Sequence, residues 1–289
     1  MNVKALIDRI SKAKKLEDVL DINQLKSEYR EAVKALHPDL SPYPEATNAL
    51  IRLNHFMEVY EKGKGFEDDA GPFKVTNGAL IYFGERELLE TSYRNFTRLT
   101  NISNDAARHF RRYLPSTMAM GTDLTAGLAD RAVPLSGLSL PQKHVNWILS
   151  RMLEVCSWFA QEGFVHAGIN PESVLVVPET HGIIIGSFYH MSLEDGRLKS
   201  LSAKYKNWYP ETVFKTKRAR TIIDLELCKR VAAYLLGDKS GMGIKLKKTH
   251  NKEFIEFLLD RHTNAYQCYQ DYRSLLDRNF EKKFYPLDL

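Results

Sequence analysis

Apolar residues recur every three or four positions through residues 24–36, QLKSEYREAVKAL, and again through residues 50–60. This period places them on one face of an α-helix. The two apolar stripes are Leu25, Tyr29, Ala32, Val33 and Leu36 in the first segment and Leu50, Leu53, Met57 and Tyr60 in the second. We therefore expect two antiparallel helices that pack these stripes against each other as a hairpin.

The segment between the two expected helices is rich in turn-forming residues, His37-Pro38-Asp39 followed by SPYP. Proline fixes its own φ angle, which favours a rigid turn that presents His37 and Asp39 at the hairpin tip. Another face of the first helix carries basic residues at every fourth position, and these are Lys26, Arg30 and Lys34. Such a stripe suits steering toward an acidic partner, although a solvated face also explains it.

The pattern changes in residues 61–72, EKGKGFEDDAGP, where glycine, proline and charge gather as in a linker. Beyond it, FKVTNGALIYFG and ELLETSYRNFTRLT have the β-branched and aromatic content of short strands. Helical periodicity returns near residue 140, and the strand-like pieces SVLVV and GIIIG lie between helices. We predict an α+β protein with an all-α domain at 1–64, a linker at 65–72, and a domain at 73–289 with strands first.

Composition narrows the function classes. The 289 residues include 44% hydrophobic and 27% charged residues, which is typical of a folded protein, and the net charge of +5 is mild. A net charge of this size permits a local basic patch, but it does not by itself indicate that the protein binds nucleic acid. The three widely spaced cysteines, Cys156, Cys228 and Cys268, exclude a zinc finger or disulfide scaffold and suit a reducing cytoplasm.

No apolar run of about eighteen residues occurs, so we expect no membrane partner. The first residues, MNVKALIDRISKAKK, lack the apolar core of a signal peptide. Both features predict a soluble, cytoplasmic protein.

The N-terminal residues 14–62 resemble a J domain of the DnaJ class, with Tyr29 eight residues before His37-Pro38-Asp39 and Leu53-Asn54 in the next helix. The resemblance implies that the tripeptide and the basic stripe dock on a DnaK-type chaperone and trigger its ATP hydrolysis. Ala49-Leu50 replaces the Lys-Phe pair usual in the family, and EKGKG stands where its short last helix is found. These departures bear on packing and on the choice of partner.

Residues 73–289 resemble a protein kinase, most clearly after residue 140. GFVHAGINPESVLVV and GIIIGSF follow the order of the kinase catalytic and metal-binding loops. Tyr209-Pro210-Glu211 stands where the family has Ala-Pro-Glu, and Asp224 opens the next buried helix. The resemblance implies a reduced, β-rich N-lobe and a mostly helical C-lobe. The combination with a J domain is similar to bacterial and bacteriophage J-domain proteins with kinase-like C-termini.

The kinase-like loops lack the groups that phosphoryl transfer requires, which are a lysine and Mg²⁺ at the phosphates and an aspartate at the attacking hydroxyl. In the frame of the resemblance, the degenerate positions are Gly168, Asn170, Ser173 and Gly186, while His166 is the loop histidine that packs inside. No lysine occurs between Lys74 and Lys143. The resemblance therefore implies a pseudokinase, with no catalytic residue and no cofactor, that serves as a platform for an unidentified protein client.

Two alternatives stay open. The first is an atypical phosphotransferase with non-standard residues, against which the missing groups count. The second is a nucleic-acid-associated adaptor that uses the basic clusters KTKRAR (215–220) and KLKK (245–248), which is not favoured because charge runs usually lie in solvent. We expect no metal site, because His166, His181 and His190 lack the helical spacing of ligands and no cysteine lies near them.

Overall fold

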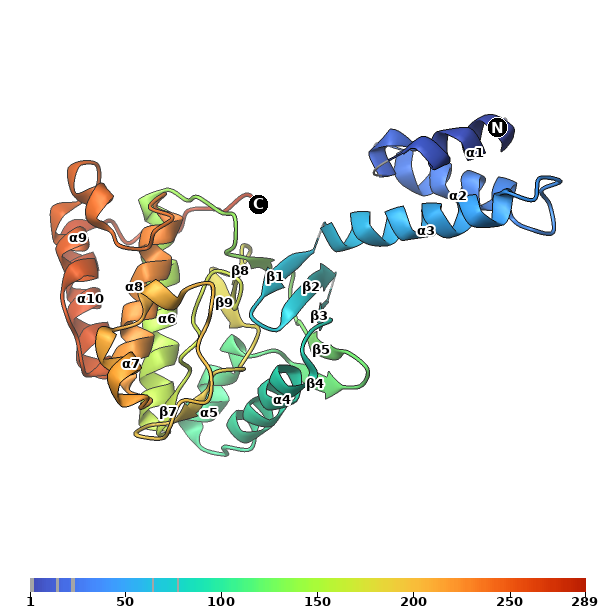
Figure 1. Ribbon diagram of the computed structural model, residues 1–289. Coiled ribbons are helices and arrows are strands. Elements are labelled where there is room, and N and C mark those ends of the chain that lie inside the picture. Colours follow the sequence, from blue (N-terminus) through green and yellow to red (C-terminus); the bar gives the residue numbers. More distant parts are fainter. Residues whose placement is uncertain (1–2, 14–15, 22–23, 64, 77) are drawn as a thin grey trace. The chain divides into compact units, whose positions relative to one another are not determined.

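The computed structural model describes residues 3–13, 16–21, 24–63, 65–76 and 78–289 (Figure 1). The chain is α+β, as expected, and divides into two compact units, Met1–Phe66 and Glu67–Leu289. None of the described helices combines the length and the apolar composition needed to cross a membrane.

The N-terminal unit is helical. It contains α1 (Val3–Lys12), a short 3₁₀ turn (Leu16–Asp18), α2 (Leu25–Leu36) and α3 (Ala46–Gly63). Helices α2 and α3 form the hairpin that the two apolar stripes predict, with Leu36 and Leu53 fully buried in a core shared with α1. The Tyr29 hydroxyl donates a hydrogen bond of 2.8 Å to Asn54 Oδ1 and so joins α2 to α3. The side chain of Tyr60 lies outside the described residues.

An antiparallel five-stranded sheet opens the second unit. Its strands are β1 (Phe66–Asp68), β2 (Gly71–Thr76), β3 (Ala79–Tyr82), β4 (Thr117–Met120) and β5 (Leu124–Gly127), in the order β1-β2-β3-β5-β4. The register pairs Phe73 with Tyr82 and Leu80 with Ala126, so that these four buried side chains share the inner face. Between β3 and β4 the chain forms α4 (Arg86–Thr100), α5 (Asp105–Phe110) and a 3₁₀ turn (Arg111–Tyr113).

Two sequence expectations change here. Residues 87–100, expected as a strand, belong to α4, because Leu89, Phe96 and Leu99 recur at helical spacing and are buried on one face. Their threonine and aromatic content suggested a strand, but tertiary packing overrides such propensities. Residues 66–72 of the expected linker form β1, a turn and the beginning of β2. Hydrogen bonds within the second unit hold Asp68, at the end of β1, and Asp69, in the turn.

The rest of the second unit is mostly helical and matches the predicted return of helices near residue 140. Its helices are α6 (Gln142–Gln161), α7 (Glu211–Thr216), α8 (Thr221–Leu235), α9 (Lys252–Leu259) and α10 (Ala265–Asn279), with 3₁₀ turns at Lys206–Trp208 and Ile244–Lys248. Figure 1 shows α8 and α10 beside the long helix α6, which packs against both.

Short strands lie between these helices. They are β6 (Val133–Pro134), β7 (Phe164–Val165), β8 (Val174–Val177), β9 (Gly182–Ile185) and β10 (Ser192–Leu193). Strands β8 and β9 pair antiparallel and confirm the two strand-like pieces of the sequence. The loop before β8 and the segment after β9 carry the residues of the kinase resemblance, and both are buried.

Candidate functional site

The tip of the α2–α3 hairpin carries His37-Pro38-Asp39. Helix α2 ends at Leu36, and His37 takes an extended backbone conformation, so the chain leaves the helix abruptly. The amides of Leu40 and Ser41 both donate to the carbonyl oxygen of His37 at 2.9 Å and close the turn. The side chains of His37 and Asp39 are 47% and 84% exposed, which leaves them accessible to a partner.

Hydrogen bonding within the turn orders the His37 ring. The backbone amide of Asp39 donates to His37 Nδ1 at 3.2 Å, and Asp39 Oδ2 lies 3.6 Å from the same nitrogen. A neutral imidazole whose Nδ1 accepts a hydrogen bond carries its proton on Nε2. The tip therefore presents an N–H donor beside a carboxylate. Leu40, in the same turn, is 63% exposed and adds apolar surface.

The basic stripe lies on α2, next to this turn. Arg30 and Lys34 are exposed there. Lys26 belongs to the same helix, but its side chain lies outside the described residues. The structure therefore places two of the three expected cations on the surface that leads to the tip.

In the second unit, the loop around His166 is anchored by Asp224 of α8. The amides of His166 and Ala167 donate to the two carboxyl oxygens of Asp224, both at 2.7 Å. His166 Nε2 lies 2.8 Å from the Ser187 carbonyl oxygen, to which it donates. Burial lowers the pKa of His166 to about 4 and raises the pKa of Asp224 to about 7. The neutral ring is thus held in the interior.

Side chains fill the space beside Gly168 and Gly186. A Cβ atom on Gly168 would lie 2.6 Å from Cδ2 of His190. A Cβ atom on Gly186 would lie 2.7 Å from the Tyr82 hydroxyl and 2.9 Å from methyl carbons of Leu80 and Leu175. Neither position has room for the carboxylate that the resemblance to a kinase would place there.

The side chains of Asn170 and Ser173 form hydrogen bonds within their own loop. Asn170 Oδ1 accepts from the amides of Glu172 and Ser173 at 3.0 and 2.8 Å, and Ser173 Oγ accepts from the Asn170 amide at 2.9 Å. Neighbouring Glu172 is buried and accepts from Lys204 Nζ and Ser136 Oγ, both at 2.7 Å. These side chains hold the loop rather than face an open site.

A buried polar cluster, which sequence reasoning missed, joins the β1–β2 turn to the segment after β9. Asp69 Oδ1 accepts from Ser202 Oγ at 2.9 Å and from the Ala203 amide at 3.0 Å, and His190 Nε2 lies 3.2 Å from Asp69 Oδ2. The other ring nitrogen of His190 lies 2.8 Å from Ser200 Oγ. Burial raises the pKa of Asp69, but the bonds from His190 and Ser202 outweigh this effect and lower the pKa below its ordinary value.

Asp68, the preceding residue, lies in a different environment. It accepts from the Tyr189 hydroxyl and from the Ala70 amide, both at 2.9 Å. Burial is the largest influence on its pKa, which rises to about 7. The sequence offered no periodic signal for either aspartate, because a charged, glycine-containing stretch is also typical of a linker.

The two basic clusters differ in their pairing. In the first, Lys215 pairs with Glu211 at 2.6 Å and Arg220 with Asp195 at 2.7 Å. In the second, the three lysines at 245, 247 and 248 are exposed around buried Leu246. The described ranges contain no group of three or more His, Cys, Asp or Glu side chains that could hold a metal ion.

Comparison with known proteins adds no assignment, because neither a protein-family model nor a curated protein matches this chain.

The buried carboxyl group of Asp68 predicts a specific pH dependence. A folded-state pKa of about 7 means that the folded protein binds this proton more tightly than the unfolded chain does, so the free energy of unfolding decreases as pH rises from about 4 to 7. Asp68→Asn keeps an acceptor for Ala70 and removes the titration. Relative to the parent, the variant should gain stability between pH 4 and 8, by up to about 4 kcal/mol.

Urea denaturation of both proteins across this pH range measures the difference. Asp224 titrates in both proteins, so its contribution cancels. Parallel stability profiles for parent and variant would show that Asp68 keeps an ordinary pKa in the folded protein.

Proposed function

We propose that this protein is a J-domain co-chaperone that recruits and stimulates a DnaK-type ATPase, and that its second unit is a catalytically inactive, kinase-like platform for a protein client. The observation that carries the proposal is the exposed His37-Pro38-Asp39 turn at the end of a two-helix hairpin. The hydrogen bond between Tyr29 and Asn54, the residues on which the resemblance rests, supports it.

The exposed turn and the basic stripe beside it offer different kinds of contact to a partner. The Nε2–H group of His37 and the carboxylate of Asp39 are directional groups on a short closed turn, so little ordering is needed upon binding. Arg30 and Lys34 on α2 add positive charge, which acts mainly on the rate of encounter.

The architecture of the second unit supports the kinase-like part of the proposal. A five-stranded antiparallel sheet with α4 between β3 and β4 precedes a mostly helical half, as expected of a β-rich lobe followed by a helical lobe. Asp224 bonds two amides of the loop that resembles the catalytic loop. The side chains packed at Gly168 and Gly186 support the inactive assignment, because they occupy the space of the missing carboxylates.

The proposal predicts that the full chain raises the single-turnover ATP hydrolysis rate of a cognate DnaK-type chaperone. His37→Gln and Asp39→Asn should each abolish the increase, because the first removes the imidazole ring and the second the negative charge from the exposed turn, while the helices stay intact. Asp8→Asn is the matched control, since it makes the same charge change on an exposed residue of α1. Circular dichroism checks that all variants keep the parent's helix content. If both tip variants stimulate ATP hydrolysis as strongly as the parent does, the tripeptide has only a structural role as a turn.

The competing assignment, an atypical phosphotransferase, makes the opposite prediction for nucleotide. A ligand at one hundred times its Kd stabilises a folded protein by about 2.7 kcal/mol and shifts the melting temperature by a few degrees. We expect no such shift of the full chain in millimolar Mg-ATP, and no transfer of labelled phosphate to itself or to generic substrates. A metal-dependent shift accompanied by transfer would establish the phosphotransferase instead.

A further inference from the structure

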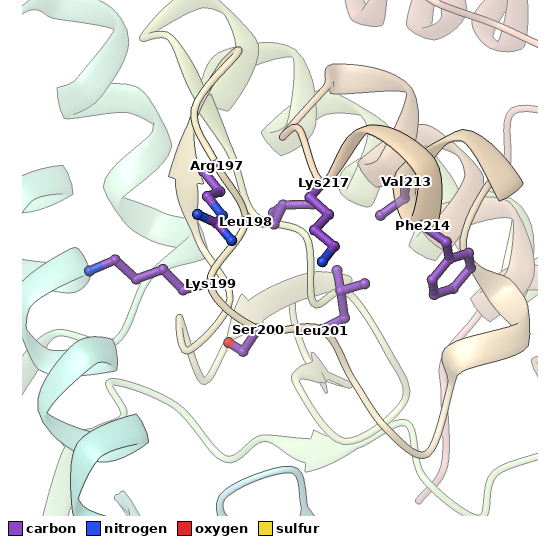
Figure 2. A pocket seen from close by; sticks show the side chains of 8 residues that line it. All are labelled: Arg197, Leu198, Lys199, Ser200, Leu201, Val213, Phe214 and Lys217. Carbon is purple, nitrogen blue, oxygen red and sulfur yellow. The ribbon is translucent and has the colours of Figure 1, made fainter.

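An open groove of about 640 Å³ lies between the segment after β10 and helix α7. Figure 2 shows the eight side chains that line it. Four of these side chains are apolar, those of Leu198, Leu201, Val213 and Phe214. Three are cationic, those of Arg197, Lys199 and Lys217, and the eighth belongs to Ser200. Leu198 and Val213 are buried, whereas Phe214 is 40% exposed, so the groove combines an apolar floor with an accessible wall.

Backbone hydrogen bonds fix the two sides of the groove against each other. The Leu198 amide donates to the Lys217 carbonyl oxygen at 2.9 Å. The Ala219 amide donates to Gly196, and the Asp195 amide to Ala219, each at 2.8 Å. This strand-like pairing gives the groove a defined shape, since residues distant in sequence are held in register.

The charges of the groove are not compensated. Neighbouring Lys215 and Arg220 have carboxylate partners, and Arg218 donates to the Asp195 carbonyl oxygen at 2.7 Å. In the described part of the chain, Arg197, Lys199 and Lys217 take part in no ion pair, and no carboxylate lines the groove. Figure 2 shows the Lys217 amine on the side of the groove where Leu201 lies. Three cations without a carboxylate give the groove a positive charge, which favours an anionic ligand.

The backbone of Lys217 provides an independent observation. Lys217 follows the last turn of α7 with φ 52° and ψ 29°, in the left-handed region. Glycine is preferred at this position at the end of a helix, because a side chain adds strain there. The end of α7 thus places a long cationic side chain on the rim of the groove, at a backbone conformation in which glycine would be less strained.

We propose that this groove binds an extended acidic peptide segment of a protein partner. An apolar side chain of the peptide lies on Leu201 and Phe214, and flanking carboxylates meet Arg197 and Lys217. A peptide fits better than a nucleic acid, because half of the lining is apolar and mostly aliphatic, whereas single strands are bound by rows of cations with stacking aromatic rings. This proposal specifies the kind of client that the second unit binds, and it rests on the proposed function of that unit as a client platform.

Fluorescence anisotropy of the full chain with a short, labelled, glutamate-rich peptide that carries one central leucine tests the proposal at low salt. No DnaK-type chaperone is present, so failure here is distinguishable from failure of ATPase stimulation. We expect saturable binding that weakens at least fivefold when serine replaces the leucine. The double variant Arg197→Ala, Lys217→Gly should bind about tenfold more weakly, the size expected for two exposed ion pairs.

Lys217→Gly separates binding from stability. Glycine removes the cation and relieves the left-handed backbone, so this variant should bind less tightly while its melting temperature stays the same or rises. Lys215→Ala, a neighbouring lysine outside the lining, is the control and should bind within twofold of the parent.

Three results would overturn the proposal. The first is that the full chain does not bind the peptide. The second is that Lys217→Gly binds the peptide as tightly as the parent does. The third is that the full chain binds a single-stranded oligonucleotide more tightly than the peptide, and that the double variant loses this binding. The last result would assign the groove to nucleic acid.

Discussion

The carboxylate of Asp69 connects the sheet of the second unit to its helical half. Its backbone belongs to the β1–β2 turn, while its hydrogen-bond donors are His190, Ser202 and the Ala203 amide, more than 120 residues further along the chain. A buried carboxylate is stable only when its oxygens are hydrogen-bonded, and the lowered pKa of Asp69 agrees with this requirement. The β1–β2 turn is thereby held against the segment after β9.

This connection has a direct consequence for the packing between the sheet and the helices. Because Asp69 and Ser200 both contact the His190 ring, the ring is fixed where it lies against Gly168. On the other side, Tyr82 from β3 fills the space at Gly186. Side chains thus fill the region around both glycines. The surfaces proposed here for recognition lie elsewhere, at the hairpin tip and in the groove beside α7.

The sequence predicts those parts of the fold that depend on local periodicity. The stripes of α2 and α3 and the apolar runs of β8 and β9 recur with a helix or strand period, and the structure contains these elements. The sequence predicts a strand where α4 lies, because Thr91, Tyr93 and Thr97 favour strands, although the buried spacing of Leu89, Phe96 and Leu99 is helical. The exposed tip at His37 was predictable from proline chemistry, since Pro38 determines the turn.

The remaining parts depend on contacts between residues distant in the chain. Nothing near Asp69 in the sequence indicates that His190 and Ser202 hydrogen-bond to it. The groove likewise requires residues 195–198 to pair with residues 217–219, and the left-handed backbone of Lys217 follows from that tertiary setting. The sequence alone places Lys217 in the basic cluster at residues 215–220, without distinguishing it from Lys215 and Arg220, which form ion pairs.

Hydrogen–deuterium exchange of the full chain, with and without a DnaK-type chaperone in the presence of ATP, tests the central claim most directly, because it locates the contact surface without any substitution. The account predicts added protection in α2 and at the amides of Leu40 and Ser41, which close the turn at the hairpin tip. The buried loop at residues 165–178 should exchange at the same rate in both samples. Unchanged exchange at the tip, with new protection confined to the second unit, would contradict the account.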